Sequence, residues 1–141
     1  MIYKTPETEL TLLLRHMSPE LSPEIYVYAS LDLNYQLAKE LNPLLIFREI
    51  ERQTIILPKI KAEYYGIDYT FPCNVITLNV HSALNAVGFL ALILSRLAQN
   101  NIPVNAISAY YHDHLLVPVD NARHALDILQ SLSEEFKIIN A

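Results

Sequence analysis

The sequence predicts an α+β fold built from ferredoxin-like βαββαβ units, and three observations support this prediction. Segments whose apolar residues alternate, as in strands, are interleaved with segments whose apolar residues recur at helical spacing. In the C-terminal half, these segments follow the order strand, helix, strand, strand, helix, strand. The N-terminal half shows a shorter version of the same order. The 141 residues are therefore interpreted as two related modules, the first abridged and the second complete.

The N-terminal half begins with a predicted helix. Thr5 is a suitable N-cap, Pro6 suits the first helical position, and apolar residues recur at helical spacing from Leu10 to Met17. Ser18-Pro19 ends this helix, because a residue that precedes proline disfavours the helical backbone. The elements that follow are a strand at residues 25–31, a weak helix near 35–40, strands at 44–50 and 54–57, and a short helix between Pro58 and Gly66.

The C-terminal half has clearer signals. Its predicted elements are a strand at 75–80, a helix capped by Ser82 that reaches about Asn100, a hairpin of residues 103–111 and 115–119, a helix capped by Asp120, and a final strand at 136–139. The best junction between the two halves is residues 68–71. We therefore expect an abridged module with the N-terminal helix in residues 1–70 and a complete module in residues 71–141.

The composition indicates what the protein contacts. Hydrophobic residues make up 52% of the chain and charged residues only 18%, which indicates that a partner chain covers part of the surface. Phe89 and Ile93 flank the main apolar stripe of the helix predicted after Ser82, so a homodimer is expected. The formal net charge of -5 argues against nucleic-acid binding.

Membrane and disulfide-based classes are also excluded. The N-terminus lacks the basic region and apolar run of a signal peptide. Polar residues interrupt the uncharged stretch from Tyr69 to Ser95 well short of the ~20 apolar residues of a membrane span, so a cytoplasmic protein without membrane contact is expected. Cys73 is the only cysteine, which excludes an internal disulfide and a cysteine-built metal cluster, and we interpret it as a buried structural thiol.

One pattern in the C-terminal half has a fixed spacing. Gly88 stands near the start of the first predicted helix there, and Ile102 follows fourteen positions later, where the next strand opens. This pattern resembles the ACT domain, a ferredoxin-like module that binds small molecules, usually amino acids, to regulate other activities. Asn101 replaces the family's glycine before the strand, and Asn readily takes the same left-handed backbone conformation. Asn85 and Val87 stand where the family has an aspartate and a proline, which departs from its usual ligand contacts.

Two strings of residues give a narrower resemblance. VHSALNAVGF and AYYHDHLLVP are similar to segments of small bacterial proteins built from tandem ACT-like domains, most of them uncharacterised, and more distantly to the CASTOR amino-acid sensors. The resemblance extends from about Leu45 to Leu132 and is weaker over the first forty residues. It implies tandem ACT-like modules, an amino acid as the small-molecule ligand, and a regulatory role.

The turn around Asp113 is the candidate functional site. In a ferredoxin-like sheet, the strand from Val75 lies antiparallel beside the strand from Leu115, which brings the end of the first strand and the following helix N-terminus next to this turn. Tyr110 and its neighbour Tyr111 are expected on opposite faces of their strand. We call the place where this turn meets the helix N-terminus the hairpin corner. The ligand-binding residues expected at the hairpin corner are Asn79, His81, Ser82, Asn85, Gly88, Tyr111, His112, Asp113 and His114.

Three interpretations of this turn remain open. The first is a polar hairpin tip whose histidines and aspartate form hydrogen bonds with the local backbone. The second is a ligand clamp, in which the helix N-terminus takes a carboxylate and Asp113 takes an ammonium. The third is a metal site that uses His81, His112 and His114. Because no closed set of metal ligands is visible, no metal or other cofactor is expected.

The sequence lacks the usual signs of an enzyme. Gly66 and Gly88 are its only glycines, so it has no phosphate-binding glycine loop, and it has no nucleophile motif. No catalytic residue is therefore assigned. The predicted function is a non-catalytic regulatory or sensor protein that binds an amino acid. The alternatives are a protein–protein interaction module without a metabolite ligand and a small metal-dependent hydrolase.

Overall fold

The computed structural model describes residues 8–139, so the predicted helix start at Thr5 and Pro6 lies outside the described residues. Helix α1 (Leu10–His16) follows Glu9, whose side chain accepts a hydrogen bond of 3.3 Å from the backbone N–H of Thr11. The helix ends before Ser18-Pro19, as predicted. The other elements are β1 (Pro19–Leu21), β2 (Tyr26–Leu31), η1 (Lys39–Leu41), β3 (Leu45–Arg48), β4 (Gln53–Pro58), α2 (Lys59–Tyr64), β5 (Thr70–Leu78), α3 (Phe89–Gln99), β6 (Asn105–Ser108), β7 (Asp113–Pro118), η2 (Val119–Asn121) and α4 (Ala122–Ile139).

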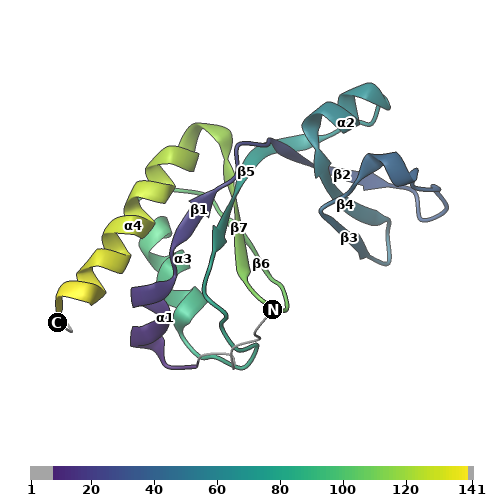
Figure 1. Ribbon diagram of the computed structural model, residues 1–141. Coiled ribbons are helices and arrows are strands. Elements are labelled where there is room, and N and C mark those ends of the chain that lie inside the picture. The colour runs from purple at the N-terminus through teal and green to yellow at the C-terminus, as the bar shows by residue number, and fades with distance from the viewer. Residues whose placement is uncertain (1–7, 140–141) are drawn as a thin grey trace. The chain divides into compact units, whose positions relative to one another are not determined.

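The chain forms two compact units, and one of them is discontinuous in sequence. Among the described residues, the C-terminal unit combines residues 8–22 with residues 75–139. Its strands lie in the order β1-β5-β7-β6, and α1, α3 and α4 lie together on one side of them (Figure 1). The helices and the facing side of the strands bury one apolar cluster, made of Leu13, Leu14, Met17, Ile76, Leu78, Phe89, Ile93, Leu97, Ile102, Leu115, Val117, Ala125, Leu126, Leu129 and Leu132.

The central unit spans Pro23–Asn74 and has the strand order β3-β4-β2-β5. Its core cluster is smaller, and it consists of Val27, Ala29, Leu41, Ile55, Leu57, Ala62 and Ile67. The two units repeat the same ferredoxin-like order if β5 is counted in both. The first residues of β5 pair with β2 and supply the last strand of the central unit, whereas its later residues supply the first strand of the C-terminal unit. The predicted junction at residues 68–71 therefore runs into the start of a strand.

The predicted final strand at 136–139 is wrong, because these residues continue helix α4. Phe136 follows Leu129 and Leu132 at helical spacing and packs against the same cluster, so the apolar pattern of the helix simply extends. The sheet position left for a last strand is taken by β1, in which Pro19 and Leu21 pair antiparallel with Leu78 and Ile76 of β5. Pro19 fits the first position of this strand, which pairs on one side only.

The predicted start of the second-half helix at Ser82 is also wrong. Residues after Ser82 form a turn in which the N–H of Ala86 donates to the carbonyl of Ala83 at 3.0 Å. Helix α3 begins only at Phe89, because Gly88 has a φ of 93°, a conformation that a helix cannot contain. A Cβ at Gly88 would lie 3.8 Å from the side chain of Leu10, which is an ordinary contact, so the backbone angle rather than crowding requires glycine.

The N-terminal segment belongs with the C-terminal unit in space. Leu13, Leu14 and Met17 are fully buried in the same cluster as the residues of α3 and α4. The compact units thus group α1 and β1 with the second half of the chain, whereas the sequence-based division places them in residues 1–70. That division remains a proposal about which segments make up each module.

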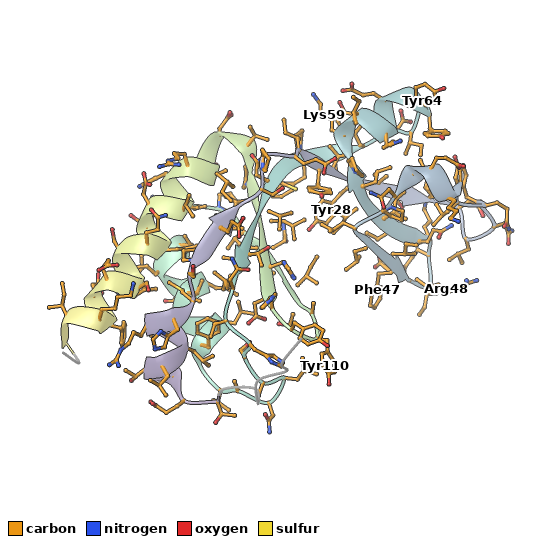
Figure 2. The ribbon with its side chains drawn as sticks, viewed as in Figure 1. Tyr28, Phe47, Arg48, Lys59, Tyr64 and Tyr110 are labelled. Carbon is orange, nitrogen blue, oxygen red and sulfur yellow. The ribbon has the colours of Figure 1, made fainter. Side chains whose placement is uncertain are left out.

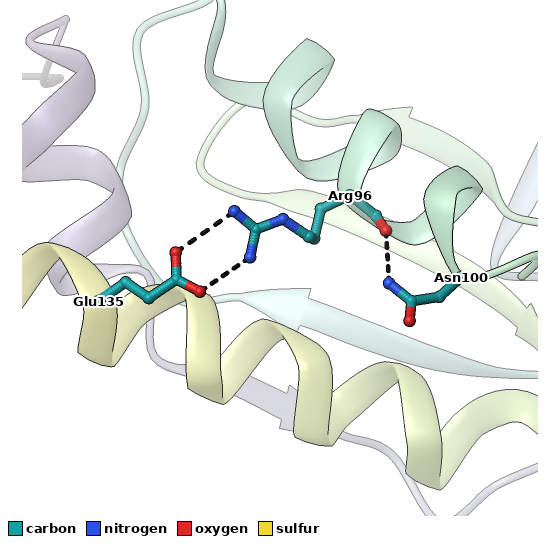
Figure 3. Close-up of polar contacts among 3 residues, drawn as sticks. All are labelled: Arg96, Asn100 and Glu135. Carbon is teal, nitrogen blue, oxygen red and sulfur yellow. Dashed lines mark hydrogen bonds and ion pairs between the residues drawn. The ribbon is translucent and has the colours of Figure 1, made fainter.

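Helices α3 and α4 contact each other within the C-terminal unit. Phe89 and Ile93 are 2% and 0% exposed in the core of their own chain, so they cannot support the predicted homodimer. On the outer surface, the guanidinium of Arg96 forms two hydrogen bonds with the carboxylate of Glu135, at 3.0 and 3.3 Å (Figure 3). Asn100 donates to the backbone carbonyl of Arg96 at 2.9 Å and covers the end of α3 (Figure 3).

Candidate functional site

The β6–β7 hairpin ends in a tight turn between Ser108 and Asp113. The N–H of Ala109 donates to the carbonyl of His112 at 3.0 Å and closes this turn. Tyr110 and its neighbour lie in the turn rather than in a strand, and their rings meet edge to face with centroids 4.9 Å apart. The prediction that the two tyrosines point to opposite faces of a strand is therefore wrong. Figure 2 shows Tyr110 at the tip of the hairpin.

Asp113 is the buried polar centre of this corner. Only 7% of the residue is exposed, and its two carboxylate oxygens accept hydrogen bonds from two serine hydroxyls. Ser82 donates to Oδ2 at 2.9 Å, and Ser108 donates to Oδ1 at 2.7 Å. The carboxylate thus joins the segment after β5, the end of β6 and the start of β7. Sequence analysis missed Ser108, because only the register of the hairpin places it directly across from Asp113.

A small cavity of about 160 Å³ lies beside this carboxylate. It is lined by Ser82, Ala83, Leu84, Ala86, Phe89, Leu90, Ser108, Ala109 and Asp113. Phe89 and Leu90 open helix α3, and no side chain caps this helix end. The first backbone N–H groups of a helix have no partner within the helix and carry its partial positive charge. The cavity therefore combines a carboxylate, two hydroxyls and a helix N-terminus, which is a suitable environment for a small zwitterion.

His114, the residue after Asp113, lies on the other face of strand β7. Asp113 shares the face of Leu115 and Val117, which belong to the core, and alternation places His114 on the opposite face. There the Nδ1 of His114 lies 2.9 Å from the hydroxyl of Thr77. Burial lowers the pKa of His114 below its ordinary value, and His112 lowers this pKa further, whereas Asp113 acts in the opposite direction. His114 is therefore neutral at pH 7.

The remaining predicted residues are spread around the corner. The rings of His81 and Tyr111 lie 5.3 Å apart, and the Nδ1 of His112 lies 3.4 Å from the carbonyl of Val80. Asn79 donates to the carbonyl of Ser18 and to the carboxylate of Glu20, so it ties the end of β5 to the N-terminal segment. Asn85 lies exposed in the turn before α3, and Gly88 directly precedes this helix. The structure brings Ser82 and Asp113 together at the cavity, and none of these other residues lines it.

Metal and thiol chemistry receive no support from the described part of the chain. Within residues 8–139, no group of three His, Cys, Asp or Glu side chains is arranged to hold a metal ion. Cys73 is fully buried, and its thiol lies 3.4 Å from the carbonyl of Tyr26. Burial raises the pKa of this thiol to about 11, so it remains protonated, and the predicted buried structural thiol is confirmed.

Comparison with models of known protein families shows the family of this chain. One ACT domain model matches residues 5–74, and a second ACT domain model matches residues 70–131. The chain belongs to the ACT domain family. The two matches in tandem confirm the fold class and the family resemblance that were predicted from the sequence.

Several solved structures are similar to the chain in fold. A Vibrio cholerae protein of unknown function, described as a possible transport protein, is 38% identical, with a TM-score of 0.78 over 88% of this chain and 95% of its own. An Agobacterium tumefaciens protein is 18% identical, with a TM-score of 0.66 over 78% of this chain and 84% of its own. The regulatory subunit of aspartate kinase from Thermus flavus is 9% identical, with a TM-score of 0.58 over 81% and 95%. None of the curated proteins matches the sequence significantly.

Tandem ACT domains fit a regulatory role in which a small molecule binds to the protein. The Thermus flavus structure is similar in fold, and its name describes a regulatory subunit. Within the described residues, no helix has the length and apolar character needed to cross a membrane.

Proposed function

We propose that this ACT protein is a non-catalytic regulatory sensor that binds a free amino acid at the corner between the β6–β7 hairpin and helix α3. The observation that carries the proposal is the buried carboxylate of Asp113, held by Ser82 and Ser108 beside the uncapped N-terminus of α3. These groups match the two charged ends that every free amino acid has.

Each end of the ligand has a suitable partner. A carboxylate oxygen can accept more than one hydrogen bond, so Asp113 has room for the ligand's ammonium in addition to the two serine hydroxyls. The ligand's carboxylate would accept from the N–H groups of Phe89 and Leu90 in the first turn of α3. Roles for Asn79, His81, Asn85, Gly88, Tyr111, His112 and His114 as ligand contacts stay predictions.

The size of the cavity restricts how the ligand enters. Its volume of about 160 Å³ is below the roughly 300 Å³ at which most small-molecule pockets begin. We expect the ammonium and carboxylate ends to occupy the cavity and the ligand's side chain to remain outside it, near the exposed Leu84. The protein then discriminates against ligands that lack either charged end, because one buried polar partner would be left unsatisfied.

A thermal-shift screen of free amino acids tests the proposal. A ligand at about 100 times its Kd adds roughly 2.7 kcal/mol, which raises the Tm by about 5–10 °C for a chain of this size. Asp113→Asn removes the negative charge but keeps a hydrogen-bond acceptor, and it should abolish the shift. Asp120→Asn, the same change at an exposed position, is the matched control and should keep it.

The main rival is an interaction module that binds no metabolite. If no amino acid shifts the Tm of the wild type, this rival replaces the sensor proposal. If a shift persists undiminished in Asp113→Asn, the protein binds an amino acid at another place. A shift that depends on added metal would instead favour the hydrolase alternative.

Self-association as a homodimer is a separate proposal. The apolar composition supports it, and so does the edge strand β3, where Ile46 and Phe47 are 53% and 62% exposed. Sedimentation at tens of micromolar should give about twice the 16.1 kDa of one chain. A species with the mass of a single chain would contradict the dimer without affecting the ligand proposal.

A further inference from the structure

A second cavity in the C-terminal unit lies away from the hairpin. It has a volume of about 320 Å³ and is enclosed by the end of α1, the start of β1 and the last turns of α4. Its charged and polar lining includes Arg15 and His16 from α1 and Ser133, Glu134 and Lys137 from α4. Unlike the hairpin cavity, it reaches the size range of ordinary small-molecule sites.

Arg15, which lines this cavity, has an unsatisfied side-chain donor. Its Nε is buried and is the one buried side-chain nitrogen or oxygen, among the described residues, that lacks a hydrogen-bond partner. A buried donor without a partner costs free energy, so such groups are rare unless another molecule satisfies them. Arg96 differs from Arg15 in this respect, because the guanidinium of Arg96 is paired with the carboxylate of Glu135.

The position of Arg15 in α1 explains why a basic residue is found here, but it does not explain why the buried Nε has no partner. Arg15 and His16 occupy its last turn, where basic side chains are favoured by the helix dipole. That preference accounts for their charge but leaves the buried Nε without an acceptor. Ser133 donates to the carbonyl of Arg15 at 3.0 Å, so the serine fixes the backbone of Arg15 against α4 without supplying the missing acceptor.

The charges of the cavity favour a small anion with one negative charge. Arg15 and Lys137 are cationic, and Glu134, which pairs with Lys137 at 3.1 Å, is the acidic residue of the lining. The Nε of an arginine and an adjacent Nη form a fork that matches the two oxygens of a carboxylate. Phosphate matches the fork as well, but its second negative charge is repelled by Glu134.

We propose that this cavity is a binding site for a small organic carboxylate, with Arg15 as the residue that takes the carboxylate group. The site is independent of the amino-acid site proposed at the hairpin corner, because the two cavities share no lining residue. A carboxylate bound here would bridge α1 and α4, and would tie the N-terminal segment to the C-terminal helix of its own unit.

Arginine side-chain NMR tests this directly, with acetate and inorganic phosphate as probes at constant ionic strength and neutral pH. The Nε–H resonance of Arg15 is identified by its absence in Arg15→Lys, and it should shift saturably as acetate is added. Arg123→Lys is the matched control, because Arg123 is an exposed arginine of α4 that does not line the cavity. The acetate response should be unchanged in this control.

Three results would overturn the proposal. One is an Arg15 resonance that does not respond saturably to acetate, and another is an equal response from every arginine. Binding of phosphate at least as tight as acetate would contradict the assignment to carboxylates. Glu134→Gln sharpens the last point, since removal of this negative charge should strengthen phosphate binding more than acetate binding. None of these outcomes depends on whether an amino acid binds at Asp113.

Discussion

The two units have the same strand order, but they differ greatly in helix content. The C-terminal unit covers its strands with helices of 7, 11 and 18 residues, whereas the central unit has only a 3-residue 3₁₀ helix and a 6-residue α-helix. Among residues 8–139, the buried cluster of the C-terminal unit has fifteen members and that of the central unit has seven. The longer helices provide helix ends and grooves, and the two candidate binding cavities described above both belong to the C-terminal unit. We infer that the fold is shared but that binding depends on the helices.

The largest expected effect is a difference in core stability. Leu129 and Leu57 are both fully buried leucines, one in each cluster. Leu→Ala changes in cores cost about 2–5 kcal/mol, and the cost rises when the surroundings cannot collapse into the cavity. We expect Leu129→Ala to lie near the upper end of this range and Leu57→Ala near its lower end. Urea unfolding of the two variants measures this, and equal losses would contradict the comparison.

The second effect is the stability of the hairpin corner. Asp113→Ala removes the acceptor of two serine hydroxyls and should lower the free energy of unfolding by about 1–3 kcal/mol. Asp113→Asn retains an acceptor and should cost less. Asp68→Ala, at an exposed position outside the helices and strands, should change stability by no more than about 0.5 kcal/mol. If Asp113→Ala is as mild as this control in thermal unfolding, the carboxylate is not a structural centre.

The third effect is a dependence of stability on pH. It originates from His114, which lies on the face of β7 opposite to Asp113. The pKa of His114 is lowered in the folded protein, so below the ordinary histidine pKa of about 6.5 the unfolded chain binds a proton more readily. Stability from this residue is therefore present above about pH 6.5 and is lost as pH falls through the folded pKa. The Tm of His114→Gln, measured from pH 7.5 to 5, should fall less steeply than that of wild type. Parallel curves would contradict this assignment.

The smallest effect is expected on the surface of the same unit. Arg96 and Glu135 are about a third and a half exposed, and pairs of this kind contribute at most about 1 kcal/mol. A double-mutant cycle with Arg96→Ala and Glu135→Ala should give a coupling energy within that limit. A larger coupling would mean that the ion pair, rather than the buried cluster, holds α3 against α4.

The sequence predicted what depends on local patterns. Periodicity located both hairpins and the main helices, and a fixed glycine spacing indicated the family. It could not predict that Pro19–Leu21 forms a strand, since three residues carry no period and their pairing with β5 is decided by the tertiary fold. The extension of α4 through Phe136 has the same origin, because packing against the core decided between helix and strand.

The candidate site was predicted in part, for a related reason. The strand order brought Ser82 next to Asp113, as the topology required. Neighbours in sequence do not share a face in a strand, however, so His114 separated from Asp113. The φ of Gly88 moved the helix start to Phe89, and no pattern of apolar residues reports a backbone angle of this kind. The role of Ser108 depends on the hairpin register, which pairs it with Asp113. The sequence alone did not define this register.

The most direct test of the central claim is an amide NMR titration of the wild-type protein with the amino acid that gives the largest thermal shift. Binding at the hairpin corner predicts that the largest saturable shifts belong to the backbone N–H groups of Phe89 and Leu90, which would receive the ligand's carboxylate. The region around Arg15 should change little in the same titration. Saturable shifts that leave Phe89 and Leu90 unmoved would contradict binding at this corner.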